Sequence, residues 1–113
     1  MKSIVILLWS VVTATIYHAV PGQTDDTPNI TATGFTINMN NPRSHNIIAV
    51  SRDLEKKGFK MGTKVCVTNA GPMNGVWVIR DRMNKRWKNR IDFLVNETRK
   101  LGKWNDVKIK KIN

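Results

Sequence analysis

The sequence predicts an all-β fold, a compact β-barrel with one or two short helices. The chain of 113 residues contains six or seven short apolar runs rich in β-branched residues, and polar turn residues separate them. Only two segments have the end signals of a helix, and both are short. A chain of this length has room for one domain with a single modest core.

The N-terminal residues predict an exported protein. Lys2 precedes an apolar run over residues 4–12, which is too short to cross a bilayer, so no transmembrane span is expected. We therefore divide the chain into a signal or hydrophobic leader, residues 1–12, and a barrel domain, residues 13–113. Cleavage after Ala14 would fit the preference for small residues. The alternative is that the run is a buried first strand, because residues 12–19 also have the composition of a β-strand.

Turn residues separate the elements of the first half of the chain. Residues 21–29 and 38–44 are predicted loops, and residues 31–37 form a short strand interrupted by Gly34. A fully apolar strand is expected at residues 47–50. Ser51 is then the predicted N-cap of a short helix that ends at Gly58.

The second half of the chain alternates turns and strands. Residues 61–68 are a turn leading into a strand, and two central strands follow at residues 76–80 and 91–95. Asn96 is expected to cap a helix over residues 97–101. Residues 106–112 form a final edge strand, whose lysines would discourage pairing with other chains.

Composition limits the function without choosing it. The formal net charge of +11 predicts attraction to a polyanion, and nucleic acid, a bacterial envelope and an anionic membrane all qualify. The single cysteine, Cys66, excludes an internal disulfide and is expected to be a small buried hydrophobe. The two histidines, His18 and His45, are not spaced as metal ligands, and neither a metal nor an organic cofactor is expected.

Two aspartates on the central strands are the candidate catalytic residues. Asp81 lies where one strand meets a loop, and alternation places Asp92 away from the most apolar face of the other strand. Cleavage of a glycosidic bond needs a carboxylic acid and often a second carboxylate nearby. The alternative is structural: Asp81 would pair with Arg80 or Arg82, and Asp92 with Arg90.

A basic loop with one tryptophan, Trp87, connects the two central strands. The basic residues around Trp87 are Arg80, Arg82, Lys85, Arg86, Lys88 and Arg90. Basic and aromatic residues interleaved in this way suit single-stranded nucleic acid, where bases stack on the ring. They suit an anionic glycan equally well. A third interpretation is a solvated loop with Trp87 folded back on the barrel.

The order of motifs resembles the three-aspartate (3D) domain, which is related to rare lipoprotein A and to the expansin and barwin group. The most specific elements of the resemblance are Gly-Thr-Lys-Val at residues 62–65 and the pair Asp81 and Asp92. Its other elements are Thr-Ala-Thr-Ile-Tyr at 13–17, Thr-Ala-Thr-Gly at 31–34, Ile-Ala-Val at 48–50, Asn-Arg-Ile-Asp-Phe at 89–93, Leu-Gly at 101–102 and Val-Lys-Ile at 107–109.

This resemblance implies a six-stranded double-psi β-barrel that acts on peptidoglycan as a lytic transglycosylase. The residue matching the general acid is Asp92, and Asp81 matches its supporting carboxylate. The residues expected to bind substrate are Tyr17, His18, Ser51, Arg80, Trp87 and Arg90. The expected partner is peptidoglycan or another anionic wall glycan, and the expected location of a monomeric protein is secreted, periplasmic or in the cell envelope.

The chain departs from the family pattern at two places. Ser51 stands where the family has its first aspartate, and Arg82-Met-Asn replaces a Gly-rich stretch. These departures favour the alternative of a non-catalytic, expansin-like module that binds or loosens wall glycan. A weaker alternative is a nucleic-acid-binding domain that uses the basic loop.

Overall fold

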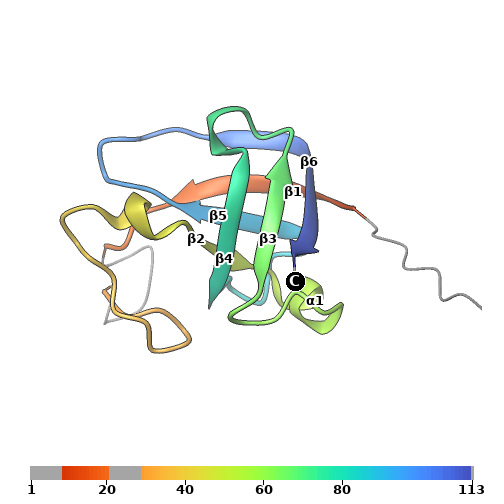
Figure 1. The fold of residues 1–113 in the computed structure, drawn as a ribbon, viewed down its shortest axis with the longest axis horizontal. Coiled ribbons are helices and arrows are strands. Elements are labelled where there is room, and N and C mark those ends of the chain that lie inside the picture. The colour runs from red at the N-terminus through yellow and green to blue at the C-terminus, as the bar shows by residue number, and fades with distance from the viewer. Residues whose placement is uncertain (1–8, 21–28, 113) are drawn as a thin grey trace, which may run out of the picture.

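Six strands close into a barrel in the computed structural model, which describes residues 9–20 and 29–112 (Figure 1). The strands are β1 (Ser10–Tyr17), β2 (Ile47–Val50), β3 (Lys64–Thr68), β4 (Gly75–Arg82), β5 (Arg90–Leu94) and β6 (Lys103–Ile112). One α-helix, α1 (Arg52–Lys56), and two 3-10 turns, η1 (Pro42–His45) and η2 (Gly71–Met73), complete the described fold. The prediction of an all-β, six-stranded barrel with a short helix is confirmed.

The strands follow the order β1-β5-β2-β4-β3-β6 around the barrel. The pairs β1/β5 and β2/β4 are parallel, and the other four pairs are antiparallel. The prediction that the last strand is an edge strand is wrong, because β6 pairs with both β1 and β3. Its lysines therefore protect no sheet edge, since a closed barrel has none.

The barrel interior holds the main core. Alternate residues point inward along β1, along β5 and along β4 as far as Ile79, as the period of two requires. Trp77 and Phe93 are the largest side chains buried there, with ring centroids 4.7 Å apart. Trp104 packs edge-on against Phe93, with ring centroids 5.7 Å apart, and so extends this aromatic cluster.

A second apolar cluster lies outside the barrel wall. It contains Tyr17, Ala19, Ile37, Ile47, Ala49, Met83 and Leu94. The long connection over residues 29–46 projects to one side of the barrel (Figure 1), and its Phe35 and Ile37 pack on this cluster. This connection therefore covers part of one outer face of the barrel and shields it from solvent.

Two predicted elements are absent from the described part of the chain. Residues 31–37 contain one isolated bridge, Ile30 to Thr36, because the chain turns at Gly34, whose φ is +83°. Residues 97–101 form a turn instead of a helix. Asn96 does not serve as the predicted helix cap: its Oδ1 accepts a hydrogen bond from the Arg43 amide at 2.9 Å.

The expected leader and the first strand overlap. The strand β1 begins at Ser10, so the end of the predicted leader belongs to the barrel wall. Cleavage after Ala14 would remove residues 10–14, five of the eight residues of this strand. Residues 1–8 of the predicted leader, and residues 21–28 of the first predicted loop, lie outside the described residues. In the described ranges, no helix is long and apolar enough to span a membrane.

Candidate functional site

A β-bulge in β4 turns Asp81 to the outer face of the barrel. Strict alternation from Trp77 and Ile79, which both point inward, would place Asp81 in the core. Between the pairs Ile48–Ile79 and Ala49–Asp81, β4 advances two residues while β2 advances one. The extra residue reverses the alternation, so Asp81 lies on the outer wall.

The register places both candidate acids on either side of one small residue. Ala49 of β2 is paired with Asp81 on β4 and with Asp92 on β5. Because neighbouring strands lie about 4.8 Å apart, the two aspartate backbones are separated by roughly 10 Å. Ala49 itself contributes only a methyl group between the two strands that carry the aspartates, and it packs in the same cluster as Tyr17. The two carboxylates therefore share one face.

Asp92 is the partly buried acid of this pair. Burial raises the pKa of the Asp92 carboxyl above its ordinary value, the charge of Asp81 adds to the increase, and a hydrogen bond from Thr15 and the positive charge of Arg90 oppose it. Thr15 lies directly opposite Asp92 on β1, and its hydroxyl donates to Asp92 Oδ1. A carboxyl group with this environment holds its proton to a higher pH than a solvated one.

Several donors hold Asp81 in place. The Tyr17 hydroxyl donates to Oδ2 at 3.2 Å, and the backbone amides of Ala32 and Arg82 donate to Oδ1 at 3.2 and 3.0 Å. Tyr17 is 7% exposed, and its burial, followed by the charge of Asp81, raises the pKa of the phenol well above its ordinary value. The phenol is therefore a neutral donor that orients Asp81.

The arginines around the site contact other groups than the sequence suggested. The guanidinium of Arg82 forms two hydrogen bonds of 2.7 Å with Glu55. That of Arg80 lies 4.5 Å from the centre of the Phe35 ring. Arg90 lies 4.2 Å from the Trp87 ring in a cation–π contact, and its positive charge also lowers the pKa of Asp92.

Trp87 is folded back on the barrel. Its ring is half-buried against the second apolar cluster, and the guanidinium of Arg86 lies 4.8 Å from its centroid, in addition to that of Arg90. Groups of the same loop thus already occupy the stacking surface that a nucleic-acid base would need. This geometry favours the third interpretation of the loop given by the sequence.

Ser51 and His18 have structural contacts. Ser51 is fully buried at the N-cap position of α1, but its hydroxyl caps no helix amide; it accepts a hydrogen bond from the Arg90 amide at 3.0 Å. The Nε2 of His18 hydrogen-bonds the carbonyl oxygen of Arg99 at 2.7 Å, and so contacts the β5–β6 connection. Neither contact involves the aspartates.

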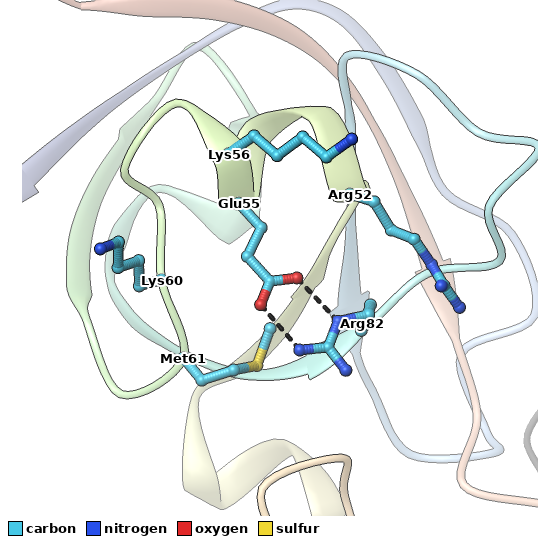
Figure 2. A pocket seen from close by; sticks show the side chains of 6 residues that line it. All are labelled: Arg52, Glu55, Lys56, Lys60, Met61 and Arg82. Carbon is cyan, nitrogen blue, oxygen red and sulfur yellow. Dashed lines mark hydrogen bonds and ion pairs between the residues drawn. The ribbon is translucent and has the colours of Figure 1, made fainter.

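A positively charged hollow of about 550 Å³ lies beside α1 and the end of β4. It is lined by Arg52, Glu55, Lys56, Lys60, Met61 and Arg82. Figure 2 shows the Glu55–Arg82 pair in the middle of this lining, with Lys56 and Lys60 on either side. Four basic side chains against one acidic one make the hollow attractive to an anionic group.

Sequence reasoning missed Thr15 and Ala49, which complete the aspartate face. Alternation along β1 puts Thr15 on the same side as Tyr17, and this was the only signal in the sequence. Their proximity to Asp92 depends on the pairing of β1 and β2 with β5, which links residues 77 and 43 positions apart.

No protein-family model matches this chain, and a comparison with curated proteins finds no match.

Proposed function

We propose that the protein is a lytic transglycosylase that cleaves the glycosidic bond of peptidoglycan between MurNAc and GlcNAc. The observation that supports this proposal best is the environment of Asp92: a partly buried carboxyl with a raised pKa, on the same outer face as a second carboxylate. A general acid must keep its proton near the working pH, and burial supplies this property. The net charge of +11 suits an exported protein that works in an anionic cell envelope.

In the proposed reaction Asp92 donates its proton to the glycosidic oxygen. The bond between that oxygen and the anomeric carbon of MurNAc breaks, and the 6-hydroxyl oxygen of the same sugar bonds to this carbon. The hydroxyl proton passes to the Asp92 carboxylate and restores the acid. The products are a shortened glycan and a 1,6-anhydro end, so no water and no cofactor is consumed.

Asp81 acts as a supporting carboxylate in this proposal. The donors on its two oxygens fix its orientation, and its negative charge raises the pKa of Asp92. A negative charge facing the sugar would also stabilise the positive charge that develops at the anomeric carbon. The positive hollow beside α1 offers a second place where an anionic group could bind.

The test is mass spectrometry of the soluble products after incubation with purified sacculi. We expect anhydro-muropeptides from the wild type and none from Asp92→Asn. The matched control is Asp106→Asn, because Asp106 is an exposed aspartate on β6 with a φ of +56°, which asparagine tolerates well. A fully active Asp92→Asn variant, or the absence of anhydro products from the wild type, would end this assignment.

The second candidate is a glycan-binding module that does not cleave. The supporting observation is at Ser51, where the related family has an aspartate: here the side chain is fully buried and bonded to backbone. The buried Met83, in place of a glycine-rich stretch, also fills space beside the aspartate face. Sacculi that bind the protein in a salt-dependent manner, without release of muropeptides, would favour this candidate.

A further inference from the structure

The outer wall formed by β4, β3, β6 and β1 combines exposed apolar residues with lysines. Four of the seven large hydrophobic residues that are exposed in the described chain lie here: Trp9, Val11, Val76 and Ile112, each 37–49% exposed. Three lysines, Lys64, Lys108 and Lys110, point outward from the same strands. We call these seven residues the lysine face.

The strand register interleaves the two kinds of side chain. Lys108 is paired with Val11 on one side and Thr68 on the other, and Lys64 is paired with Ile112. Lys110 on β6 is paired with Cys66 on β3, which is paired with Val76 on β4. The Nζ of Lys110 lies 4.4 Å from the centre of the Trp9 ring. The face is thus a continuous mixed surface.

Neither folding nor edge protection accounts for these residues. Their inward-facing neighbours, such as Val65, Val67, Val107 and Ile109, already fill the core, and each strand has two partners. Exposed apolar residues gathered on one face of a protein mark an interaction surface. Contact with a second copy through the same face would bring two sets of three lysines together, which like-charge repulsion opposes.

We propose that the lysine face binds the surface of an anionic phospholipid membrane. Tryptophan is favoured at the lipid–water interface, valine and isoleucine insert among the acyl chains, and lysine pairs with anionic headgroups while its stem lies on apolar surface. The face contains lysine and no arginine, whereas bidentate phosphate recognition in nucleic acids favours arginine. The aliphatic residues likewise offer no stacking surface for bases.

Binding in this orientation leaves the aspartate face accessible. In the strand order, β3 and β6 lie opposite β5 and β2, the strands that carry Asp92 and Ala49. The membrane surface and the candidate catalytic face are thus on opposite sides of the barrel. The membrane proposal uses none of the residues of the aspartate site, and it applies to the chain that keeps Trp9 and Val11, which lie within the predicted leader.

The test is binding of the full chain to phosphatidylcholine vesicles with and without phosphatidylglycerol. We expect binding to the anionic vesicles only, weakening as salt rises. The triple variant Lys64→Gln/Lys108→Gln/Lys110→Gln should bind about a hundredfold more weakly, at roughly fivefold per lysine. The control Lys57→Gln/Lys85→Gln/Lys100→Gln removes the same charge from exposed positions outside both the lysine face and the positive hollow, and it should lose far less. Equal losses in both triples, or equal binding to neutral vesicles, would overturn the proposal.

A second measurement reports which side chain enters the bilayer. Lipids with brominated acyl chains should quench the tryptophan fluorescence of the wild type. Trp9→Phe should remove most of this quenching, because Trp77 is buried in the core and Trp87 and Trp104 are half-buried outside the lysine face. Quenching that Trp9→Phe leaves unchanged would contradict the orientation. Binding of a single-stranded oligonucleotide that depends on the same three lysines, without vesicle binding, would reassign the face to nucleic acid.

Discussion

The hydroxyl of Thr15 donates a hydrogen bond to the carboxyl of Asp92 from the directly opposite position of the neighbouring parallel strand. Burial raises the pKa of Asp92, and this hydrogen bond lowers it, so the two effects oppose each other and burial is the larger. The proton affinity of the candidate acid is therefore set by the packing of the β1–β5 pair. This relationship can be tested without changing either aspartate.

Replacement of Thr15 by valine should move the pH profile of cleavage to higher pH. Valine keeps the shape of threonine but removes a hydrogen bond that favours the ionised carboxyl, so the pKa of Asp92 rises further. Because a general acid works in its protonated form, activity should persist to a higher pH than in the wild type. The measurement is the rate of muropeptide release from sacculi across pH.

The control for this prediction is Thr13→Val. Thr13 lies on the same face of β1 but is paired with Arg90 instead of Asp92. Its replacement should leave the alkaline limb of the profile where it is. A Thr15→Val profile identical to that of the wild type would show that the Thr15 hydroxyl does not set the protonation of the candidate acid, Asp92.

Tyr17 and Asp81 should be energetically coupled. Tyr17→Phe and Asp81→Asn each disturb the hydrogen bond of 3.2 Å between the phenol and the carboxylate. In a double-mutant cycle of urea unfolding we expect a coupling free energy of about 1 kcal/mol. We also expect Tyr17→Phe to slow cleavage, because Asp81 loses a donor that orients it. Strictly additive unfolding free energies would mean that the contact contributes nothing in solution.

Restoring an aspartate at residue 51 should damage the protein rather than activate it. The Ser51 side chain is fully buried and accepts a hydrogen bond from the Arg90 amide. The carboxylate introduced by Ser51→Asp would be desolvated there, and we expect the free energy of unfolding to fall by about 2 kcal/mol or more. Ser51→Ala, which removes the partner of the Arg90 amide and the hydrogen bond between the Ser51 hydroxyl and Asp53, should cost about 1 kcal/mol. Faster cleavage by Ser51→Asp at unchanged stability would show that a carboxylate at this position can act as the first aspartate does in the family that the sequence resembles.

The barrel was predictable from local patterns, whereas the geometry of its site was not. Alternation along residues 91–95 correctly placed Asp92 on the outer wall, and Gly58 correctly ended the region of α1. The sequence also predicted Asp81 as a site residue, but it gave no reason why the side chain of Asp81 should point outward. The bulge that turns it outward depends on a register shift between β4 and β2, and no local pattern encodes that shift.

Long-range partners also account for the errors. Asn96 is of a residue type that often caps helices, but its side-chain oxygen accepts a hydrogen bond from the Arg43 amide, 53 residues earlier. The residues after Asn96 form a turn and not the predicted helix. Cys66 was expected in the core, yet it alternates with Val65 and Val67 and is only partly buried on the outer wall. The arginines beside the aspartates also contact Glu55, Phe35 and Trp87, and the sequence does not reveal these contacts.

Asp92→Asn should be more stable than the wild type at neutral pH, although it should be inactive. The raised pKa of Asp92 means that the folded protein holds this proton more tightly than the unfolded chain, whose value is near the ordinary 3.8. The contribution of Asp92 to the free energy of unfolding is therefore largest at a pH below its pKa in the unfolded chain. It decreases as the pH rises toward its pKa in the folded protein. Asparagine can still accept the Thr15 hydrogen bond but has no charge to desolvate.

The difference in unfolding free energy between the two proteins should consequently grow with pH and then level off. Asp53 and Glu55 have lowered pKa values, so they have the opposite effect on the pH dependence of stability: their contribution is lost as the pH falls. Because both residues are present in both proteins, their contributions cancel in the difference. Urea unfolding of both proteins over a pH series measures this difference directly. A difference that does not change with pH would mean that Asp92 is solvated like a surface carboxylate, and it would then lack the property that makes it a candidate general acid.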